Sequence, residues 1–497
     1  MKNKLFLKNA MILTGTSFLL RAIGIFFRIY MATKMGPEGM GLYQLIFSIY
    51  VLAAAAGSGL PAAVMSKLSA MPNDRGRLRP LFFAIGASAF VLSISGLIFF
   101  LSADTIAISL LSDARCGLAL KILCFSLPFM GMSACIRGYF LSEHKTGIPS
   151  SAQVFEQIVR IAMFLFLLTR FANAGIEYAL AAVILGDSVA EAASFLFYAV
   201  CLGVSAGKKP KSSEKWRGRR SMIGISAPVT GSRYISTLLH SAENIIIPGC
   251  LAATVMSNEI AVGQFGMLKG MAIPLLFFPA SFLTALSTLL HPEISNAQSE
   301  GNKNAIRSRA AGAIGITLLA SILIMAVFWL FGRELSHIIY KSDGVGWIIV
   351  VLAPIVPFMY LESVCDGILK GLTQQKHSFI YNMIDSVLRI TAIFLIVPRF
   401  GMAGFLGIMI FSNIFTSSMN IRRLLKVAEL KLPIFRFIIL PVICAAAACV
   451  VGWLLTAVFG TGIVTLIIVI GVISLIYFGI MALYYRRSGG FKRIWEI

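Results

Sequence analysis

The sequence predicts an all-α, polytopic membrane protein with about fourteen transmembrane helices, because hydrophobic stretches of roughly 20 residues follow one another along the chain. Of its 497 residues, 58% are hydrophobic and only 13% are charged, with a mean hydropathy of +0.87. A soluble domain carries about 25% charged residues. The polar segments between the hydrophobic stretches are short, so we expect no sizeable soluble domain.

Taken in order, the spans divide into two predicted lobes of six helices and two additional C-terminal helices. The N-lobe covers 1–204 and the C-lobe covers 221–432, with a basic cytoplasmic linker at 205–220 between them. Spans 13 and 14 and a basic cytoplasmic tail fill 433–497. The predicted spans are 9–32, 41–66, 80–102, 117–141, 150–171, 177–203, 221–250, 260–290, 307–331, 346–370, 378–398, 402–425, 434–459 and 461–485.

The distribution of positive charge predicts the orientation. Of the 43 Lys and Arg residues, 30 lie in segments on the side of the N-terminus, seven lie in the opposite loops and six lie within spans. Basic residues concentrate in cytoplasmic loops, so both termini are expected in the cytoplasm. The net charge of +22 therefore reflects loop placement and does not indicate a nucleic-acid partner.

An internal repeat supports the two-lobe arrangement. A shift of 229 residues aligns 128–175 with 357–404 without a gap, with ten identities in 48 positions. The matches include Pro128-Phe129-Met130 with Pro357-Phe358-Met359, Gly138 with Gly367, and Arg160 with Arg389. The shift equals six spans and preserves orientation, which predicts a parallel pseudo-twofold repeat of the kind found in transporters.

Two arginines lie inside the first hydrophobic span without an acidic neighbour. Arg21 and Arg28 are seven residues apart, so they share one helix face about 10 Å apart along the axis. Thr14, Ser17 and Gly24 fall on the same face as a supporting polar stripe. A cation at bilayer depth costs at least about 2.5 kcal/mol, so it commonly faces a wet, functional cavity.

Arg233 in the seventh span and Lys269 in the eighth span are the C-lobe counterparts of these cations. If the first, second, seventh and eighth spans face one another, then Arg21, Arg28, Arg233 and Lys269 converge on a central cationic site for an anionic substrate. The alternative is that these long side chains extend to the membrane interface.

Further charges occur in pairs four residues apart. Glu156 with Arg160 and Asp385 with Arg389 predict intrahelical ion pairs, which either neutralise one another or take part in gating. Asp187 with Glu191 and Glu362 with Asp366 place like charges on one face and so need a cation, a proton or water. A coupling-ion site at Asp187 and Glu191 and solvated helix ends are both consistent with this pattern.

No metal site or cofactor is expected. The eight cysteines contain no CxxC pair, and the five histidines show no ligand spacing such as HExxH. Buried free cysteines commonly act as small hydrophobic residues. No HxxxxD motif or other catalytic constellation occurs, so no enzyme activity is expected.

The motifs resemble one membrane-transport family. Phe18-Leu-Leu-Arg21-Ala-Ile-Gly24-Ile-Phe-Phe-Arg28, followed by Gly36-Pro-Glu-Gly39-Met-Gly41-Leu-Tyr43, resembles the polysaccharide transporter branch of the multidrug/oligosaccharidyl-lipid/polysaccharide flippase superfamily. Gly59-Leu-Pro61, Leu275-Leu-Phe-Phe-Pro279 and Leu290-His-Pro292-Glu-Ile-Ser295 fit the same branch. Within it, the chain looks most like the group of stage V sporulation protein B and the lipid II flippases.

This resemblance implies a flippase that moves a polyprenyl-diphosphate-linked oligosaccharide, such as lipid II or a related peptidoglycan or spore-cortex precursor, to the outer leaflet. It implies substrate-binding roles for Arg21 and Arg28. The family has a further cationic residue in the eighth span, and Lys269 is the residue of this chain that corresponds to it. The arginines are seven residues apart here, whereas lipid II flippases of the best-known type space them by six. The resemblance also implies that spans 13 and 14 contribute to a groove for the lipid tail.

The expected setting is a bacterial cytoplasmic membrane, with the lipid-linked glycan and the bilayer as partners and a coupling ion (H+ or Na+) or the membrane potential as the driving force. Other interpretations are an exporter of another lipid-linked polysaccharide unit, a cation-coupled multidrug exporter, a membrane enzyme and a scaffold without transport activity. A multidrug exporter needs an acidic residue in its central cavity, and the first span offers only arginines.

Overall fold

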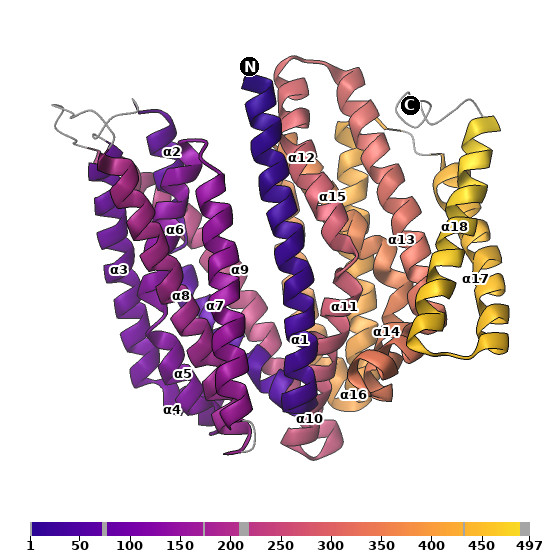
Figure 1. Ribbon diagram of the computed structural model, residues 1–497, viewed down its shortest axis with the longest axis horizontal. Helices are drawn as coiled ribbons and strands as arrows, with labels where there is room; N and C mark the ends of the chain where they lie inside the picture. Colours follow the sequence, from indigo (N-terminus) through magenta and orange to yellow (C-terminus); the bar gives the residue numbers. More distant parts are fainter. Residues whose placement is uncertain (1, 72–76, 172–173, 208–217, 431–432, 488–497) are drawn as a thin grey trace. The chain divides into compact units, whose positions relative to one another are not determined.

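The structure is a computed structural model that describes residues 2–71, 77–171, 174–207, 218–430 and 433–487 (Figure 1). Within these ranges all regular secondary structure is helical and no strand occurs, which confirms the predicted fold class. Most of the predicted linker 205–220, the tail after 487 and the side chain of Thr14 lie outside the described residues. The chain forms two compact units, Met1–Gly266 and Met267–Ile497, called the first and second units below.

The described part of the first unit contains the helices α1 to α10 and one π-helical segment, η2. The unit ends at Gly266, where the next helical segment begins. The elements are α1 (Lys2–Ala55), α2 (Gly59–Ser69), α3 (Leu78–Leu101), α4 (Ala103–Thr105), η2 (Ile106–Leu110), α5 (Cys116–Cys124), α6 (Leu127–Ser142), α7 (Gly147–Phe171), α8 (Ile176–Gly207), α9 (Arg219–Val255) and α10 (Asn258–Phe265).

The second unit begins within a π-helical segment that contains Lys269. Its elements are η4 (Gly266–Ala272), α11 (Ile273–Phe277), α12 (Ala280–Ser299), α13 (Lys303–Tyr340), α14 (Asp343–Leu352), η5 (Ala353–Ile355), α15 (Val356–Gly371), α16 (Gln375–Val427), η6 (Phe435–Ile439), α17 (Leu440–Phe459) and α18 (Ile463–Arg487).

Among the described residues, 11 helices are long and apolar enough to cross a membrane, or 12 if the bent pair α5 and α6 counts as one span. The chain is therefore a multi-pass membrane protein. Two of these helices, α1 and α16, each cover two predicted spans. The predicted total of fourteen spans is reached only if the bent pair counts as one span and α1 and α16 count as two spans each. The number fourteen thus stays a prediction.

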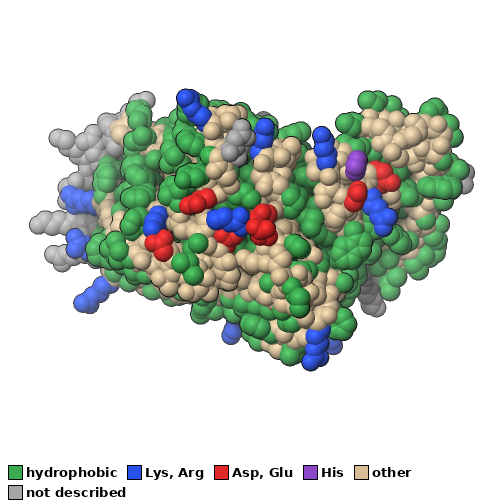
Figure 2. Space-filling view, turned by 90° about the horizontal axis from the view of Figure 1, so that it is seen from below, with side chains coloured by type: hydrophobic (Ala, Val, Ile, Leu, Met, Phe, Trp, Pro, Cys, Tyr) green, Lys and Arg blue, Asp and Glu red, His purple; other side chains and the backbone are tan. Residues whose placement is uncertain are grey.

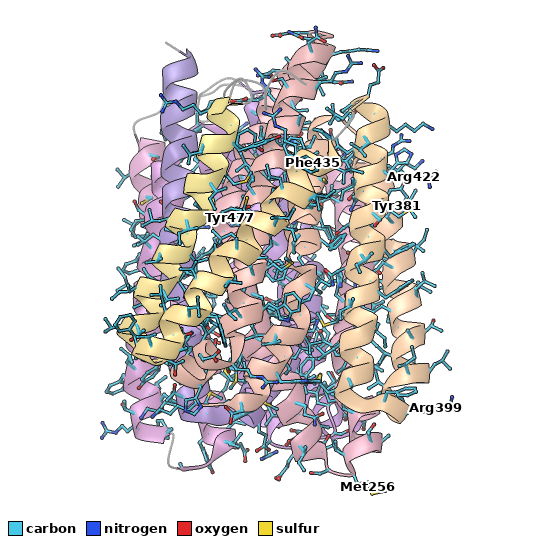
Figure 3. The ribbon with its side chains drawn as sticks, turned by 90° about the vertical axis from the view of Figure 1, so that its right-hand side faces the viewer. Met256, Tyr381, Arg399, Arg422, Phe435 and Tyr477 are labelled. Atoms are coloured by element: carbon cyan, nitrogen blue, oxygen red, sulfur yellow. The ribbon has the colours of Figure 1, made fainter. Side chains whose placement is uncertain are left out.

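Both long helices contain a glycine with non-helical backbone angles at the predicted boundary between two spans. Gly36 in α1 has φ 69° and ψ −176°, and Gly401 in α16 has φ 58° and ψ −142°. Glycine adopts positive φ without the steric cost of a Cβ atom. In Figure 3, Arg399 lies low in the view, whereas Tyr381 and Arg422, on either side of it in the sequence of α16, both lie high, so the chain reverses direction near Gly401.

Close backbone approaches at glycines set the packing of the first unit. A Cβ atom on Gly41 of α1 would lie 2.2 Å from the carbonyl oxygen of Val262 in α10. A Cβ on Gly59 of α2 would lie 2.2 Å from the carbonyl oxygen of Ser226 in α9. Small residues allow helices in a membrane to approach closely, so the glycines of these two motifs have a packing role.

The repeat mates Gly138 and Gly367 have the same role in their respective units. A Cβ on Gly138 of α6 would lie 2.8 Å from the carbonyl oxygen of Pro61 in α2. A Cβ on Gly367 of α15 would lie 1.9 Å from Ser287 Oγ in α12. In both units the fourth span of the repeat thus packs tightly on the second, which agrees with the 229-residue repeat.

The compact units divide at a different point from the predicted lobes. Helices α9 and α10 follow the predicted linker, yet they pack against α1 and α2 in the first unit. The division into two lobes of six spans stays a prediction.

The last two helices, α17 and α18, pack against each other and against α13 (Figure 1). Tyr477 of α18 is buried, and its hydroxyl donates a 2.9 Å hydrogen bond to the carbonyl oxygen of Leu319 in α13. Phe437 of η6 fills the space left by Gly315 of α13. Glycine and tyrosine contacts therefore attach the C-terminal pair to the rest of the second unit.

Candidate functional site

A cavity of about 800 Å³ lies within the first unit. Both halves of α1 line it, together with α2, α6, α7, α8 and α9, and with single residues of α3 and α5. The charged side chains in its wall are those of Arg28, Arg137, Arg160, Asp187, Glu191 and Arg233. A volume of this size suits a small molecule or the headgroup of a lipid.

Three of the arginines in the cavity wall, Arg28, Arg137 and Arg233, come from three different helices. Within the described part of the chain, none of the three makes an ion pair or a hydrogen bond. Arg side chains present several N–H donors in a planar fork that matches a phosphate or carboxylate. The cavity therefore offers unneutralised guanidinium groups from α1, α6 and α9.

The fourth arginine, Arg160 of α7, is neutralised. Its Nη2 lies 2.7 Å from Glu156 Oε1, one helical turn earlier, and its Nε lies 2.8 Å from Asp187 Oδ1 in α8. Its Nη1 donates a 2.9 Å hydrogen bond to Gln157 Oε1. The side chains of Arg160 and Asp187 are 23% and 19% exposed. The predicted Glu156–Arg160 pair is present, and it extends to a neighbouring helix.

Glu191 lies one turn after Asp187 on α8 and also lines the cavity. Among the described residues Glu191 makes no ion pair, whereas Asp187 is paired with Arg160 and accepts a 3.4 Å hydrogen bond from the Tyr43 hydroxyl. The sequence left open whether these two acids face a coupling site or solvated helix ends. Both face the cavity, so they share a compartment with the three unpaired arginines.

The other predicted site residues differ in their positions. Gly24 lines the cavity. Arg21 and Ser17 are exposed and do not belong to its wall. Lys269 is partly exposed on η4 in the second unit. Of the four cations that were predicted to converge, Arg28 and Arg233 line one cavity. The convergence of all four stays a prediction.

Arg137 is a cavity residue that the sequence analysis did not select. It lies inside the predicted fourth span, 117–141. Met130, Ala134, Arg137 and Leu141 recur at intervals of three and four residues, and all line the cavity. This helical stripe was a usable signal, since an arginine on it shares the face of Met130 and Ala134.

The second unit contains an ion pair, Asp385–Arg389, at the position that corresponds to Glu156–Arg160 in the 229-residue repeat. Arg389 is paired with Asp385 one turn earlier, as predicted. Ser412, in the second half of α16, donates hydrogen bonds of 2.7 and 2.9 Å to the two oxygens of Asp385. The Glu156–Arg160 pair of the first unit thus contacts the next helix through Asp187. The Asp385–Arg389 pair of the second unit contacts the second half of α16 through Ser412.

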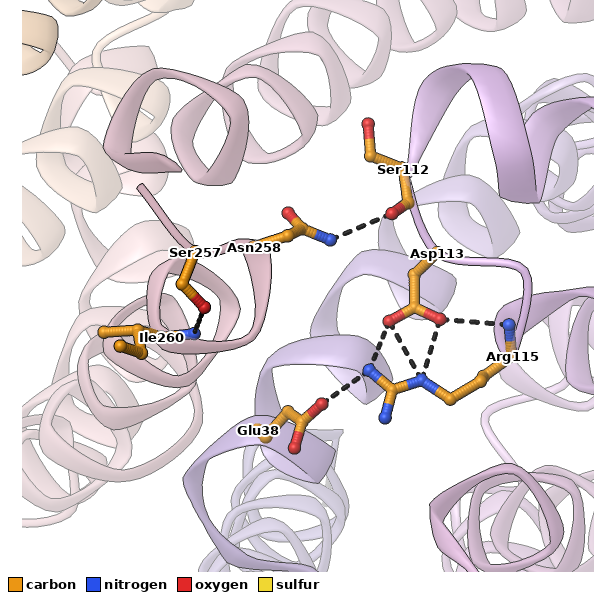
Figure 4. A network of polar contacts seen from close by, with 7 residues as sticks. All are labelled: Glu38, Ser112, Asp113, Arg115, Ser257, Asn258 and Ile260. Carbon is orange, nitrogen blue, oxygen red and sulfur yellow. Dashed lines mark hydrogen bonds and ion pairs between the residues drawn. The ribbon is translucent and has the colours of Figure 1, made fainter. Parts of the chain in front are cut away.

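A second polar network of the first unit lies around the turn in α1 (Figure 4). Arg115, before α5, lies 2.5 Å from Glu38 Oε1 and 2.6 Å from Asp113 Oδ2. The Asp113 hydrogen bond and the nearby Glu38 carboxylate raise the pKa of Arg115 above its ordinary value. Asn258 of α10 donates a 2.9 Å hydrogen bond to the carbonyl oxygen of Ser112. The network fixes the residues after Gly36 to the loop before α5.

Acidic and basic side chains also lie next to one another on the end face shown in Figure 2. Within the described residues of the whole chain, no group of three or more His, Cys, Asp or Glu side chains is arranged to hold a metal ion.

A family model for polysaccharide biosynthesis proteins matches residues 6–298, more than half of the chain. The chain belongs to the polysaccharide biosynthesis protein family. A second model, MatE, matches residues 251–395. The family match covers all the residues that line the cavity of the first unit.

Individual proteins extend this comparison. The chain is 29% identical to stage V sporulation protein B of Bacillus subtilis (strain 168) over 416 residues, which cover 80% of this chain and 79% of the relative. It is 23% identical to lipid II flippase MurJ of the same organism over 438 residues, which cover 78% and 77% of the two chains.

A solved structure of lipid II flippase MurJ in an inward closed conformation has the same fold. The TM-score is 0.73 at 15% identity, and the match covers 96% of this chain and 99% of that one.

Proposed function

We propose that the protein is a flippase for a polyprenyl-diphosphate-linked oligosaccharide, which it moves from the cytoplasmic to the outer leaflet. The observation that carries the proposal is the cavity whose wall includes Arg28, Arg137 and Arg233, none of which makes an ion pair with another described residue. The similarity to lipid II flippase MurJ and to stage V sporulation protein B favours a peptidoglycan or spore-cortex precursor as the substrate.

The chemistry of such a substrate fits the cavity. A sugar headgroup cannot cross about 30 Å of hydrocarbon unaided, so it needs a polar compartment. Its diphosphate carries negative charge that arginine binds through paired, charge-assisted hydrogen bonds. Arg28 and Arg233 are the substrate-binding residues predicted from the sequence, and Arg137 joins them. Arg21 and Lys269 bind the diphosphate at other stages of transport in this proposal.

The proposed transport cycle is alternating access. The headgroup occupies the cavity while the polyprenyl chain stays in lipid, and rearrangement of the lobes exposes the cavity to the other side. A potential that is negative inside favours outward movement of an anion by about 2.3 kcal/mol per charge per 100 mV. Asp187 and Glu191 are the proposed site for a coupling proton or Na+. The Glu156–Arg160 and Asp385–Arg389 pairs are the proposed gating elements.

A cation-coupled multidrug exporter is the second candidate, favoured by the MatE match over residues 251–395. Such a protein binds cationic drugs through acidic side chains. Here the two carboxylates of the cavity share it with four arginines, and Asp187 is already paired with Arg160. The excess of positive charge therefore favours an anionic headgroup over a cationic drug.

A binding experiment separates these functions. The purified protein in nanodiscs is titrated with undecaprenyl diphosphate, with lipid II and with a cationic dye. We expect both lipids to bind and the dye not to bind, and we expect Arg28→Ala and Arg233→Ala to weaken lipid binding. Arg170→Ala is the matched control, since Arg170 is exposed near the end of α7 and does not line the cavity. Binding of the dye in place of the lipids would support the multidrug exporter.

A further inference from the structure

Three aromatic side chains form a continuous face on the wall of the same cavity. Tyr43, Phe47 and Tyr50 lie on the second half of α1, at intervals of four and three residues, and all three line the cavity. The ring centroids of Tyr43 and Phe47 are 6.1 Å apart with an interplanar angle of 22°. Those of Phe47 and Tyr50 are 6.0 Å apart at 45°.

The two tyrosines of this aromatic face are held by their hydroxyl groups. The Tyr43 hydroxyl donates a hydrogen bond of 3.4 Å to Asp187 Oδ2. The Tyr50 hydroxyl contacts Met130 Sδ at 3.2 Å and accepts a 3.4 Å hydrogen bond from Ser126 Oγ. Because the hydroxyl groups are bound to α6, α8 and the turn before α6, the rings cannot swing freely, and the planes next to the cavity are pre-organised.

Phe47 lies between the two tyrosines and is 40% exposed, although it lines a cavity rich in charged groups. An occupant that covers this ring must present an apolar surface. The same occupant must also satisfy Arg28 and Glu191, which line the cavity without ion pairs among the described residues. An alkyl chain would cover the ring but leave the charged groups desolvated and unpaired, which is costly.

A pyranose ring meets both demands. Its C–H faces are apolar and stack on aromatic rings, while its hydroxyl groups project from the edge and form hydrogen bonds with charged side chains. We propose that Tyr43, Phe47 and Tyr50 form a sugar-stacking platform, which recognises the saccharide of the substrate while the arginines bind its diphosphate. This inference rests on the proposed function and adds a second element of specificity, for the sugar and not only for the charge.

The platform is tested with two lipids that differ only in the headgroup: lipid II, which carries sugars, and undecaprenyl diphosphate, which carries none. Affinities are measured for wild type, Phe47→Leu and Phe47→Tyr in nanodiscs. We expect Phe47→Leu to weaken lipid II binding about three- to tenfold, as for loss of one aromatic stacking contact, and to leave undecaprenyl diphosphate binding unchanged. Phe47→Tyr keeps the ring and is expected to retain wild-type affinity.

Two controls make the outcome specific. Phe26→Leu removes an aromatic ring that is 71% exposed on the first half of α1 and does not line the cavity, so it is expected to change neither affinity. Arg28→Ala is expected to weaken the binding of both lipids. Equal losses for the two lipids in Phe47→Leu, or no loss for either, overturn the platform while the proposed function stands. Wild type that binds neither lipid overturns both.

Discussion

Arg137 allows the sharpest test of the cavity, because its role follows from the structure and not from the family motif. The substitution Arg137→Gln keeps a polar side chain of similar shape and removes the charge. Arg137 is exposed to the cavity and makes no ion pair among the described residues, so its removal breaks no ion pair. Substitutions at exposed positions usually alter stability by about 0.5 kcal/mol or less.

The expected effect on binding is much larger. One hydrogen bond to a charged group contributes about 1.5–3 kcal/mol, and each 1.4 kcal/mol is a factor of about ten in affinity. We therefore expect Arg137→Gln to weaken the binding of undecaprenyl diphosphate by about 10- to 150-fold. Arg137→Lys keeps the charge but loses the planar fork, so it is expected to fall between wild type and Arg137→Gln.

The assay is a titration of undecaprenyl diphosphate at two salt concentrations, accompanied by thermal unfolding of each variant. A fall in affinity without a fall in the unfolding temperature is the predicted pattern, and the affinity of wild type should fall more with salt than that of Arg137→Gln. If Arg137→Gln binds the lipid as wild type does, the assignment of Arg137 to the anion site is refuted.

Three further predictions concern packing and charge. Arg160→Leu leaves Glu156 and Asp187 without their shared cation, so we expect destabilisation of about 3–5 kcal/mol, seen as a lower unfolding temperature and partly reversed by adding Asp187→Asn. Gly41→Ala places a Cβ atom 2.2 Å from the carbonyl oxygen of Val262, whereas Gly86→Ala meets nothing within 4 Å; only the first should reduce the yield of folded protein on size-exclusion chromatography. Lys303 and Arg307 lower the pKa of Glu429, so the stability from this contact is fully present above the ordinary Glu pKa of about 4.3 and is lost as the pH falls through the lower folded-state value. Thermal scans between pH 3 and 6 should show that dependence in wild type and less of it in Glu429→Gln.

Much of the fold was accessible from the sequence because hydrophobic length and helical spacing are local properties. The turn glycines Gly36 and Gly401 lie between the predicted spans 9–32 and 41–66 and between 378–398 and 402–425. The repeat mates Gly138 and Gly367 also have equivalent packing roles. The boundary between compact units was not accessible, because it depends on the contacts of α9 and α10 with α1 and α2.

The site was only partly accessible for the same reason. Helical spacing alone predicted the pairing of Glu156 with Arg160, but the approach of Asp187 to the same arginine depends on how α7 packs on α8. Arg21 and Arg28 share a helix face in the sequence, yet only Arg28 lines the cavity. The aromatic residues of α1 resembled ordinary membrane-span residues until the cavity beside them was located.

The central claim is that the cavity of the first unit carries a lipid diphosphate across the membrane. Its most direct test is lipid II flipping in proteoliposomes, measured for wild type beside Arg28→Ala at equal levels of reconstituted, folded protein. We predict transport by wild type and loss of transport in Arg28→Ala. Full transport by Arg28→Ala would contradict the role of the cavity, and no transport by folded wild type would contradict lipid II as the substrate.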